Sequence, residues 1–153
     1  MMTAPSVLLP TVDDTRLFGA RLAAVLRPGD LVILTGRLGA GKTALVQGIG
    51  AGLGVEGRIA SPTFVIARVH PGPLPLVHVD AYRLSSLGEV DDLDLDFDAG
   101  DVVTVVEWGH GLVEQINDER LEIVLDRFDD SEERVAQLIA HGGDWADRVA
   151  RIG

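Results

Sequence analysis

One stretch of eight residues, Gly36 to Thr43, constrains the fold of this chain more than any other part of its sequence. It reads GRLGAGKT and matches the pattern G-x-x-x-x-G-K-[ST] at every fixed position. An apolar run at residues 31–35 precedes it, and a segment of helical character at residues 42–53 follows it. A buried strand, a glycine-rich turn and a helix in this order predict a loop whose backbone N–H groups bind phosphate.

Lys42 is the only lysine of the chain, and all the other basic residues are arginines. An ammonium is a compact point charge that reaches β- and γ-phosphates, whereas a guanidinium is a wide planar fork. Thr43 would place its hydroxyl on Mg²⁺, which needs a second protein oxygen from a neighbouring strand end. Asp80 closes the run LVHVD and Glu107 closes VVTVVE, so the residues alone leave two candidates for that ligand.

Length and charge limit the remaining possibilities. The 153 residues are enough for one core, and we expect a single domain over residues 1–153. The net charge of −11 disfavours direct binding of nucleic acid, which rewards clustered Lys and Arg. The chain has no cysteine, which excludes disulfides and thiolate catalysis. It shows no signal-peptide pattern and no apolar stretch of membrane-spanning length, so we expect a cytoplasmic protein.

The hydrophobic pattern predicts alternating helices and strands. Thr11 caps a helix that carries Phe18 and Leu22 on one face. Strands are expected at residues 31–35, 63–69, 76–80, 101–107 and 121–125, with 63–69 and 76–80 forming an edge hairpin. Helices are expected at residues 42–53, 85–98 and 145–152, while residues 134–140 fit either strand or helix. This order favours an α/β, three-layer P-loop NTPase-like domain whose central sheet is mostly parallel, with antiparallel additions.

Several segments together resemble the bacterial TsaE (YjeE) family, small ATPases of tRNA threonylcarbamoyladenosine biosynthesis. The matching segments are DDTRLFGARLAAVLRPGDLVILTGRLGAGKT, LVQGIGAGLGV, SPTF, HVDAYRL and VVTVVEWGHGL, in family order and spacing. They cover residues 13–112, with a looser match to about residue 143. The phosphate loop alone would indicate only a nucleotide, whereas SPTF, HVDAYRL and the EW pair are far more specific.

The resemblance implies an ATP-binding, Mg²⁺-dependent ATPase with a defined set of site residues. The loop that holds ATP comprises Gly36, Arg37, Leu38, Gly39, Ala40, Gly41, Lys42 and Thr43. Glu107 is similar to the Mg²⁺-linked acid of the family, which favours it over Asp80 as the metal ligand. Asp80 would then orient water or support the metal's other ligands.

Four further residues take roles from the resemblance. Thr63, in SPTF, would contact the γ-phosphate or the attacking water, and Trp108 would position the nucleotide or a partner. Thr15 matches a family threonine near the base, and Arg134 matches a late family arginine. His78, in HVDAYRL, is interpreted as structural or hydrogen-bonded rather than catalytic.

The resemblance also implies the TsaD and TsaB proteins as partners, with tRNA contacted only indirectly and no membrane. We expect ATPase activity to be weak without partners. One departure from the family is Arg37, which stands where an acid is common, at a position that the motif leaves variable.

Two other functions compete with this one. A small-molecule kinase would need an acceptor pocket and an arginine-rich lid, and no such cluster follows Glu107. A nucleotide-gated binding module with vestigial hydrolysis fits poorly with intact Lys42, Thr43, Asp80 and Glu107.

Overall fold

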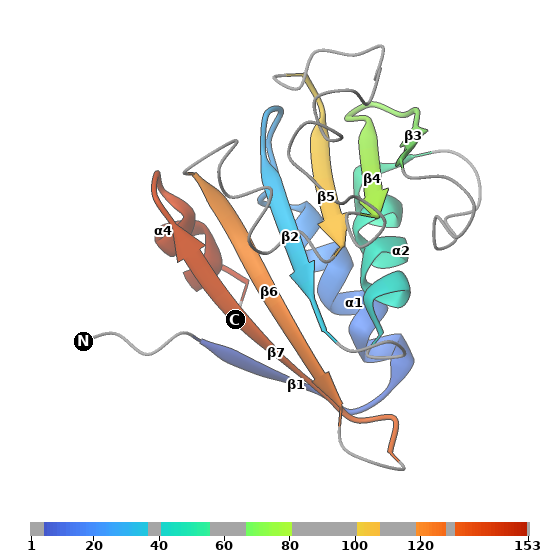
Figure 1. The fold of residues 1–153 in the computed structure, drawn as a ribbon, viewed down its shortest axis with the longest axis vertical. Helices are drawn as coiled ribbons and strands as arrows, with labels where there is room; N and C mark the ends of the chain where they lie inside the picture. Colours follow the sequence, from blue (N-terminus) through green and yellow to red (C-terminus); the bar gives the residue numbers. More distant parts are fainter. Residues whose placement is uncertain are drawn as a thin grey trace.

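The computed structural model describes residues 5–36, 41–55, 67–80, 101–107, 119–127 and 131–152 (Figure 1). Its elements in chain order are β1 (Ser6–Leu9), α1 (Val12–Ala23), β2 (Leu31–Thr35), α2 (Lys42–Leu53), β3 (Ala67–His70), β4 (Leu76–Asp80), β5 (Val103–Glu107), β6 (Arg120–Arg127), β7 (Arg134–His141) and α4 (Trp145–Ala150).

The strands form one seven-stranded sheet in the order β1-β7-β6-β2-β5-β4-β3. The four central strands, β6, β2, β5 and β4, are parallel, and antiparallel pairings add β7 and β1 at one edge and β3 at the other. The expected α/β class with antiparallel additions is confirmed, and the sheet as a whole is mixed. The predicted edge hairpin is present, because β3 pairs with β4 and ends the sheet.

β2 lies at the centre of this sheet, between β5 and β6. Its residues Leu31 to Leu34 are all buried, as the continuous apolar run predicts for a strand covered on both faces. Helices α1 and α2 lie side by side across one face of the sheet (Figure 1). β2, the strand that leads into the motif, is therefore held by β5 and β6 on its two sides and lies in the sheet that the two helices cover on one face.

The start of α1 follows the sequence prediction. The Thr11 hydroxyl accepts a hydrogen bond from the backbone N–H of Asp14 at 3.2 Å, and the Asp14 carboxylate accepts one from the backbone N–H of Thr11 at 3.0 Å. This reciprocal capping satisfies two helix-end donors and fixes where the helix begins. From there the apolar side chains of Phe18 and Leu22 point into the core, where both are buried.

α1 and α2 pack at unusually close range because glycines line their contact. A methyl group on Gly48 of α2 would collide with the backbone carbonyl oxygen of Arg16, and one on Gly19 of α1 would crowd the backbone at Leu45. α2 spans the predicted residues 42–53 and ends at Gly54, whose φ of 74° is the left-handed conformation that favours glycine. The glycines thus serve the helix contact as well as the turn.

Other sequence predictions have mixed outcomes. Residues 134–141 are a strand, which settles the ambiguous segment, and α4 confirms the expected last helix. β1 is a short edge strand that the pattern did not predict. The start of the predicted strand at residues 63–66 and the helix at residues 85–98 lie outside the described residues, so the third layer stays a prediction. No helix in the described ranges has the length and apolar character needed to cross a membrane.

α4 is held against the end of α1 by a buried ion pair. Arg148 donates two hydrogen bonds to Asp30, at 2.6 and 3.1 Å, and its guanidinium lies 3.7 Å from the centre of the Trp145 ring. Arg148 also pairs with Asp144, whose pKa is lowered mainly by a hydrogen bond from Arg27. Arg148 of α4 and Asp144, the residue before this helix, thereby anchor the C-terminal segment to Asp30 and Arg27 in the loop that precedes β2.

We expect Gly48→Ala to destabilise the protein by about 1–3 kcal/mol, because the added methyl group meets backbone that cannot move without separating the helices. Thermal unfolding should then occur several degrees lower, at roughly 2–4 °C per kcal/mol for a chain of this size. Ala51→Ser, on the exposed side of the same helix, is the matched control and should change stability by no more than about 0.5 kcal/mol. Equal melting temperatures for the two variants would contradict the close contact.

Candidate active site

The carboxyl ends of three parallel strands meet at one edge of the sheet. In the strand register Glu107, at the end of β5, lies opposite Leu34 of β2 on one side and Asp80 of β4 on the other. Gly36, the first residue of the phosphate-binding motif, follows two positions after Leu34. The two acids that the sequence offered as metal ligands are thus backbone neighbours beside the motif.

Lys42 is the first residue of α2, and its side chain folds back over the start of the motif. The Nζ atom donates a hydrogen bond to the carbonyl oxygen of Gly36 at 2.7 Å, and the residue is only 6% exposed. A buried ammonium is costly unless it is paired or hydrogen-bonded, so a cation kept here needs a polar environment. The structure therefore concentrates positive charge at the N-terminus of a helix, where an anion is favoured.

Gly41 shapes the entry into α2. Its φ of 101° lies in the region that favours glycine, and the Cβ of any other residue would stand 3.5 Å from Nε of Arg134. Arg134, at the start of β7, donates from Nη1 to the carbonyl oxygens of Ser131 at 2.9 Å and Glu133 at 3.2 Å. The tertiary fold therefore brings a second cation beside the last glycine of the motif.

Glu107 is almost fully enclosed, at 4% exposure. Its Oε2 atom is 2.8 Å from Nε2 of His78, a residue of β4 that is 0% exposed. His78 and Glu107 belong to the neighbouring parallel strands β4 and β5. The sequence predicted a structural or hydrogen-bonded role for His78 but not its partner, because the two residues are 29 positions apart in the chain.

The other predicted site residues fall into two groups. Thr43 lies in the first turn of α2 and is partly buried, while Thr15 is buried in α1 with its hydroxyl 3.4 Å from the carbonyl oxygen of Thr11. Outside the described residues lie Arg37, Leu38, Gly39, Ala40, Thr63 and Trp108, together with the side chain of Asp80. Their roles stay predictions.

This arrangement suits a nucleotide bound with magnesium. A buried lysine and a helix N-terminus attract phosphate, and a hydroxyl and a carboxylate are oxygen ligands of the kind that Mg²⁺ prefers. Magnesium in phosphate-transfer sites takes one or two protein oxygens and completes its shell with phosphate and water. Among the predicted site residues, Thr43 and Glu107 carry oxygens of this kind.

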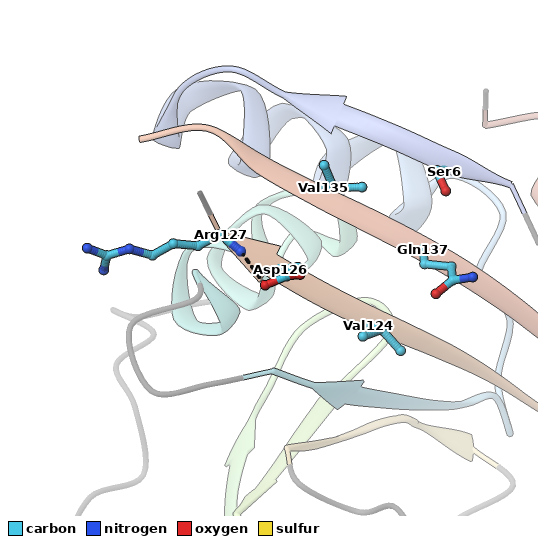
Figure 2. A pocket seen from close by; sticks show the side chains of 6 residues that line it. All are labelled: Ser6, Val124, Asp126, Arg127, Val135 and Gln137. Carbon is cyan, nitrogen blue, oxygen red and sulfur yellow. Dashed lines mark hydrogen bonds between the residues drawn. The ribbon is translucent and has the colours of Figure 1, made fainter. Parts of the chain in front are cut away.

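A separate hollow of about 330 Å³ lies on the face of the sheet turned away from α1 and α2 (Figure 2). It is lined by Ser6 of β1, Val124, Asp126 and Arg127 of β6, and Val135 and Gln137 of β7. None of the residues predicted for the site belongs to this lining, and sequence reasoning gave no sign of it. β6 and β7 supply most of the lining, and β1, which the pattern did not predict, adds Ser6.

We expect Arg134→Ala to weaken binding of a fluorescent ATP analogue by about tenfold, equivalent to about 1.4 kcal/mol, because a cation beside the phosphate loop is lost. Fluorescence titration measures the dissociation constant. Arg21→Ala removes an exposed arginine from the last turn of α1 and is the control that should bind as the wild type does. Equal affinity for Arg134→Ala and wild type would show that Arg134 does not contact the nucleotide.

Comparison with known proteins identifies related sequences. The family model described as threonylcarbamoyl adenosine biosynthesis protein TsaE matches residues 9–136. A Streptomyces coelicolor protein named tRNA threonylcarbamoyladenosine biosynthesis protein TsaE is 62% identical over 117 residues, which are 73% of this chain and 78% of that protein. A Mycobacterium tuberculosis protein of the same name is 49% identical over 138 residues, 84% of this chain and 82% of its own length.

The fold has a counterpart among solved structures. The crystal structure of YdiB from Bacillus subtilis superposes with a TM-score of 0.80 at 33% identity, covering 99% of this chain and 95% of that one. The sequence match and the shared fold extend over the same central strands and the phosphate-binding motif. This chain belongs to the TsaE family.

Proposed function

We propose that this protein is an ATP-binding, Mg²⁺-dependent ATPase that supports threonylcarbamoyl transfer to adenosine in tRNA as part of a multiprotein complex. The observation that carries the proposal is the buried ammonium of Lys42, held 2.7 Å from the Gly36 carbonyl oxygen at the strand edge that Glu107 also occupies. Membership of the TsaE family supports the pathway. The succession of β2, the motif and α2 supports a P-loop NTPase-like domain.

The site residues divide the work of phosphoryl transfer to water. Lys42 binds the β- and γ-phosphates and stabilises the charge that develops there. Thr43 and Glu107 would hold the magnesium ion, which when bound neutralises phosphate charge. Asp80 orients the attacking water or supports the metal's ligands, and Thr63 contacts the γ-phosphate or that water.

Positioning and electrostatics do most of the work in phosphoryl transfer, so a partner can complete the site. We propose TsaD and TsaB as those partners and expect slow hydrolysis without them. The net charge of −11 is unfavourable for a polyanion, which supports indirect contact with tRNA. In this view ATP hydrolysis drives or resets the assembly rather than acting on the nucleic acid.

Steady-state ATP turnover tests the proposal, measured for the protein alone and with TsaB, TsaD and tRNA. We expect a low basal rate that rises at least about tenfold when the partners are added. Lys42→Ala should abolish turnover and weaken nucleotide binding, because the charge on the phosphates is then left uncompensated. Arg21→Ala, which alters an exposed arginine away from the site, should behave as the wild type.

Two results would change the conclusion. An ATP turnover rate that does not change when the partner proteins are added would contradict the proposed role in the pathway. A coupled assay with nucleosides and sugars as acceptors would then test for kinase activity. ATP turnover by Lys42→Ala at the wild-type rate would contradict the proposal that Lys42 binds the phosphates.

A further inference from the structure

The polar pair buried in the sheet next to the candidate site has a role that the proposed function leaves unassigned. His78 sits in the middle of β4 and is 0% exposed, and Glu107 ends β5 at 4% exposure. In the register His78 lies opposite Val105, two residues before Glu107. The imidazole therefore approaches the carboxylate from the interior of the sheet, while the strand ends, where the motif begins, lie on the other side.

The donor and acceptor in this pair can be assigned. An ionised carboxylate only accepts hydrogen bonds, so with Glu107 in the ionised form that binds a metal, the donor in the 2.8 Å contact is the Nε2–H of His78. Within the part of the chain that the structure describes, the other ring nitrogen, Nδ1, is buried without a hydrogen-bond partner. A proton on Nε2 leaves a lone pair rather than an N–H on this unpaired atom, and buried N–H groups without a partner are the rarer case in proteins.

The geometry points to His78 as a positioning residue for the metal ligand Glu107, an inference that rests on the proposed function. The Nε2–H group donates to Oε2 and holds the carboxylate in one orientation, in which Glu107 would serve as a ligand of Mg²⁺. A ligating carboxylate is commonly fixed in this way by a hydrogen bond from behind, and loss of that partner lowers metal affinity about ten- to a hundredfold. His78 does not touch the nucleotide or the metal.

The burial of both side chains strengthens this hydrogen bond and raises the cost of losing it. With water excluded, no solvent molecule is at hand to replace the imidazole as the donor to Oε2. A carboxylate left without that donor would turn toward any other polar group in reach. The expected consequence is a weaker metal site within a nucleotide site that is otherwise intact.

The test compares nucleotide binding with and without magnesium. The dissociation constant of mant-AMP-PNP, a slowly hydrolysed ATP analogue, is measured in Mg²⁺ and in EDTA for the wild type, His78→Leu and His78→Gln. We expect His78→Leu to lower the enhancement by Mg²⁺ about tenfold or more and to change binding in EDTA by less than about twofold. His78→Gln should restore most of the enhancement, since its amide nitrogen lies as many bonds from Cβ as Nε2 does.

The chain offers a control in a second histidine–glutamate pair, on β7 and β6. His141, at the end of β7, has a side chain that is 32% exposed, and its Nε2 is 3.4 Å from Oε2 of the buried Glu122, away from the motif. His141→Leu should leave the Mg²⁺ enhancement at the wild-type value. An equal loss in both variants would overturn the inference, because the effect would then come from general loosening of the sheet.

Failure of the inference and failure of the proposed function give different results. If the wild type shows no Lys42-dependent nucleotide binding, the proposed function fails and the inference fails with it. If the wild type binds with a clear Mg²⁺ enhancement that His78→Leu retains, only the inference is overturned. The same holds if His78→Leu loses affinity equally in Mg²⁺ and EDTA, which is the mark of a core residue.

A second measurement takes its result from the wild-type protein, and a variant serves only to assign the signals. Nitrogen-15 NMR of the histidine rings in the wild type reports which nitrogen of His78 carries the proton, with His78→Gln used to assign its signals. We expect the proton on Nε2, both alone and with Mg²⁺ and AMP-PNP. An Nε2 without a proton would overturn the inference, because it could not donate to Glu107.

Discussion

The parallel pairing of β2 with β5, and of β5 with β4, is the constraint on which the rest of the structure depends. It brings Glu107 beside Leu34 and Asp80, so that a motif on one strand and acids on two others share an edge. Parallel strands must be joined by long crossovers, and for this reason the three segments can lie far apart in the chain. A shift of one residue in either pairing would turn Glu107 to the other face and dismantle the site.

The packing of α1 against α2 also supports the residues at the carboxyl ends of the central strands. The glycines of α1 and α2 let two backbones approach closely, and this fixes α2, whose first residue is Lys42. Because the ammonium projects from the first turn, any displacement of α2 would move it relative to Gly36. The packing of the helix pair is therefore linked to the position of the Lys42 ammonium relative to Gly36.

Burial makes the hydrogen bonds of the polar site residues stronger and the loss of a partner more costly. Lys42, His78 and Glu107 are all at most 6% exposed, in a region where isolated charges are costly and hydrogen bonds are strong. Each of these side chains has a polar partner, namely the Gly36 carbonyl for the lysine and the other member of the pair for His78 and Glu107. Such hydrogen bonds hold the three side chains in place, so that binding of the proposed nucleotide would order them at little cost.

The sequence by itself determined the local elements and the chemistry of the motif. Three features show this: the apolar run of β2, the capping residues of α1 and the glycine that ends α2. Each depends on interactions between residues that are close in the sequence, so each can be predicted from the sequence. The resemblance to the TsaE family was also visible in short segments, and the family match confirms it.

Only the tertiary structure decided the strand order, the contact of His78 with Glu107 and the placement of Arg134 against Gly41. It also revealed β1, which is too short and too exposed to leave a pattern and forms by pairing with β7. These features join residues that are distant in the chain. Local preference cannot specify them, because they depend on which of many possible strand pairings buries the most apolar surface.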